Sequence, residues 1–328
     1  MTSHIRQKLL SWYEEAHRDL PWRRTRDPYA IWISEIMLQQ TRVAAVIPFY
    51  YRFLERFPDI ESLAAAPEAD LLACWSGLGY YSRVRNMQNA ARQMNGRFPA
   101  DYDAIRALAG VGDYTAAAVA SIAYGLPHAV LDGNVIRVLS RLTNNAGDVG
   151  DLSTRRQLQQ AAGQLLDAKQ PGLFNQAVME LGATVCLPRQ PQCLLCPIAE
   201  FCRAKHQGTA GELPVKVRKT EPVKLQRTVL VIQRDGGILM WRRPDDSRKL
   251  AGFWELPEPH LLPSAEIGVC LGEFRHSITN HNYVFCVSLA EAQRIPRQFK
   301  WVSAGELQTL PLSTTSRKAL TLFRKSSE

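Results

Sequence analysis

Four cysteines lie close together in one short window of the chain, CLPRQPQCLLCPIAEFC, residues 186–202. Their spacing is C-x6-C-x2-C-x5-C, formed by Cys186, Cys193, Cys196 and Cys202. Four thiolates on a short loop can bind one zinc ion or one [4Fe–4S] cluster. Structural zinc is usually bound by two C-x2-C-like pairs separated by a longer segment, whereas here one such pair lies between two unequal arms. The spacing favours the cluster and leaves zinc open.

Two carboxylates in apolar surroundings could perform acid–base or nucleophilic chemistry. Glu35 lies between Ile33 and Ile36, and burial raises the pKa of a carboxyl, so Glu35 could stay protonated near neutral pH as a general acid. The ordinary alternative is a first-turn helix glutamate stabilised by the helix dipole. Asp132 comes directly before a predicted helix in LPHAVLDGNVIRVLSRL, where an aspartate ordinarily caps the helix N-terminus.

A glycine pair could bind a phosphate. LAGVGDYTAAAVAS, residues 108–121, places Gly110 and Gly112 around Val111, directly before a helix rich in small residues. Glycines permit positive φ and close approach of the backbone, and a helix N-terminus offers unpaired N–H groups to an anion. A plain connection between two helices has the same pattern, so the glycines alone do not decide between the two.

The elements that must position these side chains are helical up to about residue 205. Apolar residues recur there at three- and four-residue steps, and Gly, Pro, Ser or Asp stands at the ends of each segment. The first segment predicts an amphipathic helix with one apolar side formed by Ile5, Leu9, Trp12 and Tyr13. Residues 207–226 are polar, contain proline and lack periodicity, which is typical of a linker.

The pattern changes after the linker. RTVLVIQRDGGILMWRRP, residues 227–244, predicts two strands around an Asp235-Gly236-Gly237 turn. Residues 283–289 predict another strand and residues 312–325 a closing helix. We therefore expect an all-α domain over residues 1–206 that includes the cysteine loop, a linker over 207–226, and an α+β domain over 227–328.

Composition restricts the class of protein. The chain has 328 residues, of which 46% are hydrophobic and 22% charged, as in soluble globular proteins. No apolar run is long enough to span a membrane, and the N-terminus lacks an apolar signal core, so we expect a reducing, cytoplasmic setting. A disulfide framework is not expected there, and we expect Cys74, Cys270 and Cys286 to be buried core thiols. The formal charge of +9 favours a polyanionic partner such as nucleic acid.

One segment, PWRRTRDPYAIWISEIMLQQTRVAAVIPFY, residues 21–50, contains P-W-R followed by W-x-S-E-x-M-L-Q-Q-T. Together with GLGYYSRVRN at 77–86, the LDGN sequence and the cysteine loop, it closely resembles the adenine DNA glycosylase (MutY) family of the helix-hairpin-helix-GPD superfamily. The resemblance covers residues 5–205. It implies an all-α helix-hairpin-helix glycosylase domain with a [4Fe–4S] cluster bound by the four cysteines. The chain departs from the family's usual L-P-G-V-G hairpin at Ala109, which stands where the proline would be.

The resemblance also implies a reaction, base-excision repair by hydrolysis of the N-glycosidic bond of adenine. Glu35 would protonate N7 of an adenine paired with 8-oxoguanine or guanine. Asp132 would stabilise the oxocarbenium-like sugar cation. Lyases of the superfamily carry a Schiff-base lysine where this chain has Tyr114, so we expect a monofunctional enzyme that removes the base without cutting the strand.

Further site residues follow from the same resemblance. Tyr114 and Asn134 would orient Asp132 and the attacking water, and Arg23 would line the pocket. The target adenine would be flipped out of the duplex. Contacts to the DNA and the bases are expected from Leu38, Gln39, Gln40, Tyr81, Gly110, Val111 and Gly112, and phosphate contacts on the cysteine loop from Arg189, Arg203 and Lys205. For Tyr81 the alternative is core packing.

The C-terminal domain resembles the opening of a MutT/Nudix fold. It lacks the R-E-x-x-E-E helix that binds Mg²⁺ in Nudix hydrolases, so we do not expect nucleotide hydrolysis. In the family this domain recognises 8-oxoguanine, often with an F-x-H-x-F-S-H turn. Alignment of FRHSITNHNY at Phe274 puts Ile278, Thr279 and Asn280 in that turn. We expect hydrogen bonds to the lesion from Thr279 and Asn280, with His281 as a substitute.

The expected partner is double-stranded DNA with an A·8-oxoguanine or A·G mispair. We expect a monomer without membrane association, in the cytoplasm and at the nucleoid in a bacterium. Three alternatives stay open: a thymine glycosylase acting on G·T pairs, a mismatch-binding protein without catalysis, and a Nudix pyrophosphatase. Glu35 and the C-terminal domain argue against the first, and the missing metal-binding helix argues against the third.

Overall fold

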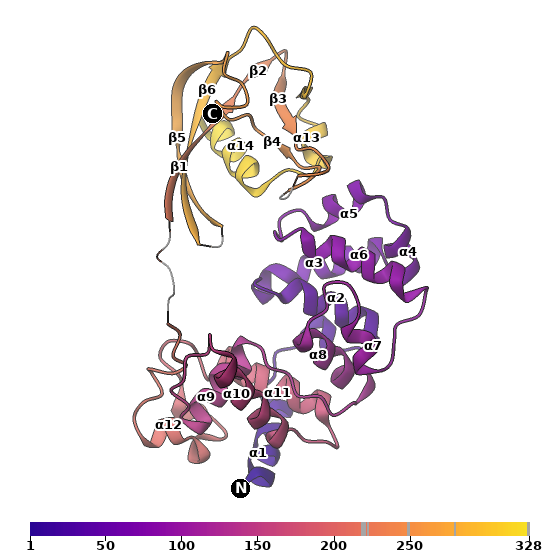
Figure 1. The fold of residues 1–328 in the computed structure, drawn as a ribbon, viewed down its shortest axis with the longest axis vertical. Coiled ribbons are helices and arrows are strands. Elements are labelled where there is room, and N and C mark those ends of the chain that lie inside the picture. The colour runs from indigo at the N-terminus through magenta and orange to yellow at the C-terminus, as the bar shows by residue number, and fades with distance from the viewer. Residues whose placement is uncertain (218–220, 222, 248–249, 279, 327–328) are drawn as a thin grey trace. The chain divides into compact units, whose positions relative to one another are not determined.

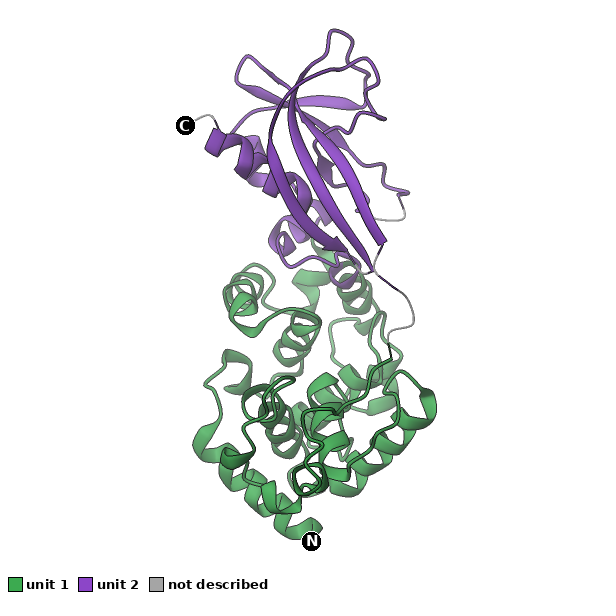
Figure 2. Ribbon diagram, turned by 90° about the vertical axis from the view of Figure 1, so that its left-hand side faces the viewer, with its two compact units in different colours: residues 1–66, 85–217 green, residues 67–84, 218–328 purple. Residues whose placement is uncertain are grey.

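The computed structural model describes residues 1–217, 221, 223–247, 250–278 and 280–326. The chain divides into two compact units, one of residues 1–66 and 85–217 and one of residues 67–84 and 218–328 (Figure 2). The first unit is helical, and the strands belong to the second. The predicted fold class, an all-α part followed by an α+β part, is therefore confirmed.

The first unit consists of helices joined by short loops (Figure 1). Its N-terminal part contains α1 (Thr2–Ala16), η1 (Pro21–Arg23), α2 (Pro28–Leu38), α3 (Val43–Arg56), α4 (Ile60–Ala65) and most of α6 (Ser82–Met94). Its C-terminal part contains α7 (Tyr102–Arg106), α8 (Asp113–Tyr124), α9 (Gly133–Thr143), α10 (Leu152–Leu165), α11 (Pro171–Thr184), η2 (Cys193–Leu195), η3 (Ala199–Phe201) and α12 (Arg203–His206). The predicted N-terminal helix is confirmed as α1, with Ile5, Leu9 and Tyr13 buried.

The helix ends follow local chemistry. The carboxylate of Asp27 accepts hydrogen bonds from the backbone N–H groups of Tyr29 and Ala30, so α2 begins at Pro28. Helix α8 begins directly after the glycine pair and ends at Gly125, whose φ of 68° is left-handed. These ends place Glu35 and the start of α8 within reach of each other, because α2 and α8 pack together.

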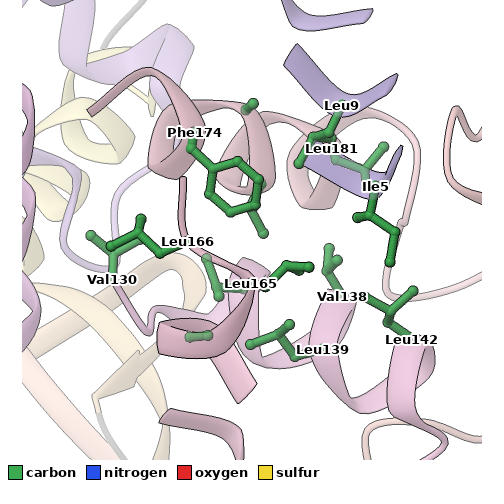
Figure 3. Close-up of a cluster of buried hydrophobic side chains, with 14 of the residues drawn as sticks. Ile5, Leu9, Val130, Val138, Leu139, Leu142, Leu165, Leu166, Phe174 and Leu181 are labelled. Carbon is green, nitrogen blue, oxygen red and sulfur yellow. The ribbon is translucent and has the colours of Figure 1, made fainter. Parts of the chain in front are cut away.

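A hydrophobic core supports the C-terminal helices of this unit. Helix α11 packs against α1, α8 and α9. Figure 3 shows side chains from these helices and their neighbours meeting in one cluster, among them Ile5, Leu9, Val138, Leu139, Leu165, Phe174 and Leu181. Full burial of one such side chain contributes about 1.5–3 kcal/mol. The core therefore holds the N-terminal ends of α8 and α9 in a defined arrangement.

The second unit contains α5 (Glu68–Trp75) and two small sheets. In the first sheet β6 (His281–Glu291) lies between β1 (Val223–Val231), which is parallel to it, and β5 (Glu266–Ile278), which is antiparallel. In the second sheet β3 (Gly237–Arg242) pairs with β2 (Gln233–Arg234), β4 (Trp254–Glu255) and β7 (Phe299–Val302). Helix α13 (Glu306–Thr309) precedes α14 (Thr314–Ser326), which packs on β1, β4, β5 and β6.

Most of the predicted strands and the closing helix are confirmed here. The Asp235-Gly236 turn joins β2 to β3, and both turn residues have positive φ, 49° and 74°. The first strand of the predicted hairpin is divided, however, because residues up to Val231 pair with β6 in the other sheet. The strand predicted at 283–289 is β6 and the closing helix is α14. Strands β4, β5 and β7 were not predicted.

The domain boundaries predicted at 206 and 227 stay a prediction. Along the chain, the division between the two units after residue 217 falls within the predicted linker. Residues 67–84, which the sequence analysis placed in the helical domain, group with the C-terminal residues. In that unit the guanidinium of Arg317 donates a hydrogen bond of 2.6 Å to Oγ of Ser76, and the rings of Tyr81 and Phe253 lie 4.0 Å apart.

Within the described part of the chain, no helix is both long and apolar enough to cross a membrane.

Candidate active site

A pocket of about 640 Å³ opens in the helical unit. Its walls come from η1, the C-terminal end of α2, the glycine hairpin, the N-terminal ends of α8 and α9, and α11. Most residues that the sequence analysis predicted for the site line it: Arg23, Glu35, Leu38, Gln39, Gln40, Gly110, Gly112, Tyr114, Asp132 and Asn134. The helices thus bring together side chains that lie up to about 110 residues apart in the chain, from Arg23 to Asn134.

Glu35 is a buried carboxyl group of the pocket, with 5% of its surface exposed. It lies in the last turn of α2, so the alternative of a first-turn glutamate stabilised by the helix dipole is wrong. Burial raises the pKa of Glu35 to about 7. The hydrogen bond from Tyr114 and the charge of Arg23 oppose this rise, whereas the charge of Asp132 adds to it. A carboxyl with this pKa can donate a proton at neutral pH.

Tyr114 is the hydrogen-bond partner of Glu35. Its hydroxyl donates to Oε2 of Glu35 over 2.5 Å and also lies 3.4 Å from Sδ of Met179. This contact arises because α2 packs against α8, which places the Tyr114 hydroxyl at Glu35. The role expected for Tyr114 from the sequence, to orient Asp132 and the water, is not tested by this contact and stays a prediction. Burial raises the pKa of Tyr114 well above its ordinary value, so the hydroxyl stays a donor.

Asp132 caps α9, as the sequence predicted. Its Oδ1 accepts from the backbone N–H of Val135 over 2.7 Å, and its Oδ2 accepts from Nδ2 of Asn134 over 2.8 Å. Arg137 fixes the Asn134 amide by donating to its Oδ1 over 2.8 Å. A Cβ at Gly182 on α11 would lie 2.7 Å from Cβ of Asn134, so the two helices cross tightly there. Burial raises the pKa of Asp132 above its usual range, although these hydrogen bonds oppose the rise.

Two further charged residues of the pocket, Glu180 and Arg18, were missed by the sequence analysis. Glu180 on α11 is fully buried, and its carboxylate accepts from Nε and Nη2 of Arg18 and from Nη2 of Arg23, each over 2.7 Å. These bonds lower the pKa of Glu180 to about 2, against the effect of its burial. Arg23 also lies over the ring of Tyr13. A glutamate inside the apolar stretch FNQAVMELGATV was the sequence signal for this ion pair.

The glycine hairpin lies between α7 and α8. Gly110 has a φ of 75°, and an added Cβ would come within 2.6 Å of Cβ of Asn86. Gly112 caps α8 and has open space around it, whereas Val111 is buried and does not line the pocket. At Ala109, where the family usually has proline, the backbone N–H donates to Oε1 of Gln93 over 2.8 Å. A proline could not make this bond.

The segment after α2 carries the polar residues expected to contact DNA. Nε2 of Gln39 donates to Oγ1 of Thr115 over 3.3 Å, and Gln40 is exposed with a φ of 57°. Tyr81 lies elsewhere: it is buried in the second unit, against Phe253. This packing is the alternative that the sequence left open for Tyr81, and its contact with DNA stays a prediction.

The turn expected to contact a lesion joins β5 to β6 in the second unit. Thr279 lies outside the described residues. Nδ2 of Asn280 donates to the backbone carbonyl of Glu221 over 3.0 Å. His281 begins β6, and its ring stacks on that of Tyr283 at 6.1 Å. A role of these residues at a base is not tested by their contacts and stays a prediction.

The four cysteines of the loop line a second, smaller cavity of about 30 Å³. Buried Arg141 lines it too, and its Nη1 donates to Sγ of Cys186 over 3.2 Å and to the carbonyl of Leu187 over 2.7 Å. Among the described residues no group of His, Cys, Asp or Glu has the spacing to hold a single metal ion. Four thiols that line one cavity are a donor set that fits a [4Fe–4S] cluster. Arg189, Arg203 and Lys205 are exposed on this loop.

The cysteine loop is connected to the pocket through Arg137. Its Nε donates to the carbonyl of Cys186 over 2.7 Å, and its Nη2 donates to Oδ1 of Asn134 and to the carbonyl of Gly182. One buried guanidinium therefore joins the loop, α11 and the residue that orients Asp132. The sequence had no periodicity or motif that indicated this connection.

Comparison with known proteins places these features in a family. Residues 33–164 match the model of the HhH-GPD superfamily base excision DNA repair protein. The adenine DNA glycosylase of Mus musculus is 33% identical, over 97% of this chain and 78% of that protein. The adenine DNA glycosylase of Homo sapiens is also 33% identical, over 98% of this chain and 74% of that protein. Both matches extend through the second unit.

Solved structures resemble the helical unit. A thermostable thymine-DNA glycosylase is 29% identical with a TM-score of 0.56, over 63% of this chain and 97% of that one. An endonuclease III–DNA complex has a TM-score of 0.54 and covers the same share of this chain. Its identity of 24% shows a common fold alone.

Proposed function

The chain belongs to the adenine DNA glycosylase family of base-excision repair enzymes, and from its pocket we propose that it releases adenine paired with 8-oxoguanine or guanine by protonating N7. The observation that supports this most directly is the pair of carboxyl groups in one pocket. Glu35 has a pKa of about 7 and a tyrosine donor, whereas Asp132 is bound by donors that stabilise its charged form.

The proposed reaction begins with the proton of Glu35. Adenine is a poor leaving group as an anion, so its N7 takes this proton while the bond between N9 and the sugar breaks and its electron pair stays on the base. Tyr114 then donates a hydrogen bond to the Glu35 carboxylate that remains. The sugar becomes a cation, which the carboxylate of Asp132 stabilises from the start of α9. Water attacks the cation and loses a proton to solvent, and Glu35 takes a proton from solvent, which restores the enzyme. The strand stays intact because Tyr114 stands where lyases have an amine.

Access to the pocket requires that the adenine leave the duplex. The exposed side chain of Gln40 and the neighbouring Leu38 and Gln39 lie at its rim and would fill the vacated stack or contact the opposite base. The glycine hairpin at 110–112 and the N-terminus of α8 would bind the phosphate backbone through N–H groups. Double-stranded DNA is accordingly the substrate, bound by a monomer.

We propose that Cys186, Cys193, Cys196 and Cys202 bind a [4Fe–4S] cluster. When bound, such a cluster supplies four metal–thiolate bonds that cross-link the loop, which brings exposed Arg189, Arg203 and Lys205 into an ordered phosphate-binding surface. Arg141 donates hydrogen bonds to Sγ of Cys186 and to the carbonyl of Leu187, and these bonds fix the loop. No step of the reaction passes through the cluster.

The second unit would recognise the base opposite adenine. Residues 256–265, between β4 and β5, form no helix, so the acidic Mg²⁺ helix of Nudix hydrolases has no counterpart there. In the sequence, Ile278, Thr279 and Asn280 stand where other family members have the Phe-Ser-His turn, with His281 as the proposed substitute. Hydrogen bonds from this turn to 8-oxoguanine are part of the proposal.

Single-turnover base release tests the proposal on three matched duplexes, with A opposite 8-oxoguanine, A opposite G, and T opposite G. We expect adenine release to be fastest opposite 8-oxoguanine. Equal rates opposite 8-oxoguanine and G would contradict the proposed recognition of the lesion but would agree with the proposed release of adenine. The likeness to a thymine-DNA glycosylase makes the third duplex informative, since release of thymine would instead favour that activity.

A Glu35→Gln variant separates catalysis from binding. The amide keeps the size of the side chain and accepts the Tyr114 hydrogen bond, but it has no proton of suitable acidity to give. We expect duplex binding to survive and adenine release to be lost. If the variant still releases adenine at the parent rate, Glu35 is not the acid.

A further inference from the structure

Two cysteines of the second unit lie in contact on neighbouring strands. Sγ of Cys270 on β5 is 2.8 Å from Sγ of Cys286 on β6, and both thiols are free. A disulfide bond is about 2.0 Å long, so a small movement would join the two atoms. The sequence predicted buried core thiols at Cys74, Cys270 and Cys286. That prediction is wrong for Cys270, which is exposed to solvent, and Cys74 and Cys286 are only partly buried.

The contact depends on an irregularity of the β5–β6 pair. Cys270 pairs with Ser288 and Gly272 pairs with Val287, so β5 has an extra residue at this point. Gly272 has a φ of 146°, which few other residues adopt. Cys270 and Cys286 are therefore diagonal neighbours, which ordinarily lie about 7–8 Å apart in an antiparallel pair. The bulge brings their sulfur atoms together.

The two thiols are not equivalent. The hydrogen bond between them raises the pKa of Cys286, and Oγ of Ser288 lies 3.5 Å from the same sulfur. Cys286 is half-buried, whereas Cys270 faces solvent. A reagent in solution therefore meets the sulfur of Cys270 first, with Cys286 in position as the second thiol.

We propose that Cys270 and Cys286 are a redox-active thiol pair that forms a reversible disulfide by exchange with a small disulfide such as oxidised glutathione. The Cys270 thiolate attacks one sulfur of the oxidant, which breaks the oxidant's S–S bond and releases one thiolate. The Cys286 thiolate then attacks Sγ of Cys270, forms the intramolecular bond and releases the second thiolate. The two protons of the pair end on the two released thiols, and the two electrons reduce the oxidant.

Such a bond cross-links the hairpin that carries the 278–281 turn. Cytosolic disulfides are usually transient and redox-sensing, which agrees with an exposed pair in a chain without a disulfide framework. The inference rests on the contacts of β5 and β6 and is independent of the proposed function.

The test uses the full chain, with the proposed cluster bound in its cysteine loop. It is incubated in a series of buffers that differ in their concentrations of oxidised and reduced glutathione. After free thiols are alkylated, peptides are analysed by mass spectrometry without reduction. We expect a peptide pair linked through Cys270 and Cys286. While little of the protein is linked, its amount should rise about tenfold for each tenfold rise in the ratio of oxidised glutathione to the square of reduced glutathione. Dithiothreitol should restore both thiols.

Three variants sharpen the test. In Cys286→Ser the second step is impossible, so we expect a stable mixed disulfide between glutathione and Cys270. Cys270→Ser should show neither linkage nor rapid modification of Cys286. Cys74→Ser, a matched control outside the pair, should link like the parent. The proposal is overturned if the parent protein accumulates as much mixed disulfide at Cys270 as the Cys286→Ser variant does. This comparison does not depend on enzymatic activity.

Discussion

Glu35 and Tyr114 form a short hydrogen bond in a site where burial disfavours the charged form of both side chains. In the proposed mechanism the tyrosine hydroxyl stabilises the carboxylate that remains after proton transfer. Asp132 would have the opposite task, and it accepts hydrogen bonds from N–H groups of Val135 and Asn134. The proposal thus gives two carboxyl groups different roles through their surroundings.

The first prediction is the pH dependence of adenine release. In the proposed mechanism Glu35 acts in its protonated form, so the raised pKa of about 7 should keep the single-turnover rate level up to about pH 7. Above that pH the rate should fall about tenfold per pH unit, as the carboxyl loses its proton. Without the rise in pKa, this fall would begin near the ordinary value of 4.5. The rate should also fall at low pH, where Asp132 gains a proton. This fall should begin above pH 3.8, the ordinary pKa of an aspartate, because the pKa of Asp132 is raised too. A rate that keeps rising to pH 9 would contradict the assignment.

A second prediction concerns Glu180, which neutralises Arg18 and Arg23 in the wall of the pocket. Glu180→Gln leaves two guanidinium groups with one neutral partner, and loss of one partner of a buried ion pair costs about 3–5 kcal/mol. The unbalanced charge of Arg23 would also stabilise the Glu35 carboxylate, so the alkaline fall in rate should move to lower pH. Denaturant unfolding measures the first effect and the pH profile of base release measures the second.

A matched control for that variant is Asp19→Asn. Asp19, which follows Arg18 in the sequence, forms an ion pair with Arg24, and both side chains are exposed. Exposed pairs contribute little to stability. We expect an unchanged pH profile for Asp19→Asn, and an equal shift in both variants would show that Glu180 has no special effect on Glu35.

At the scale of elements, the glycine hairpin and α8 act together. Helix α8 supplies Tyr114 from its first turn, and the hairpin before it sets where that turn begins. The hydrogen bond from Ala109 to Gln93 fixes the hairpin by a different means from the family's proline. A missing proline therefore does not imply a loose hairpin.

The third prediction compares two glycines of this hairpin. Gly110→Ala forces a left-handed φ, at about 1–2 kcal/mol, and puts a Cβ against Asn86. Gly112→Ala meets open space at a negative φ and should cost less. We expect Gly110→Ala to lower both the stability to denaturant and the affinity for duplex DNA more than Gly112→Ala does. Equal losses in the two variants would mean that neither the backbone conformation nor the contact with Asn86 matters.

At the scale of the whole molecule, the cysteine loop and the pocket share one support. Arg137 reaches the loop at Cys186 and the site at Asn134, and Arg141 joins the loop to the segment before the second unit at Leu213. Ordering of the loop is therefore expected to influence Asp132 as well as the contacts to DNA.

The fourth prediction is the effect of removing the proposed cluster. Removal should lower duplex affinity strongly, since the exposed basic residues of the loop lose their fixed positions. It should lower the single-turnover rate on the bound duplex less, because Glu35 and Tyr114 lie on α2 and α8, away from the loop. Binding at several salt concentrations, with single-turnover rates at saturating enzyme, separates the two effects. A protein that binds DNA with unchanged affinity and salt dependence after removal would contradict the role given to the loop.

The sequence by itself determined what depends on local order. It predicted the helical and strand-rich parts, the Asp132 cap, the glycine hairpin and the four-cysteine loop, because caps, turns and ligand spacings are set by residues within a few positions of each other. Only the tertiary structure decided which side chains meet across helices. Tyr114 donates to Glu35 because α2 packs on α8, Glu180 neutralises Arg23 because α11 lies beside η1, and Cys270 meets Cys286 because a bulge shifts β5 against β6. Such contacts join residues far apart in the chain, and no periodicity records them.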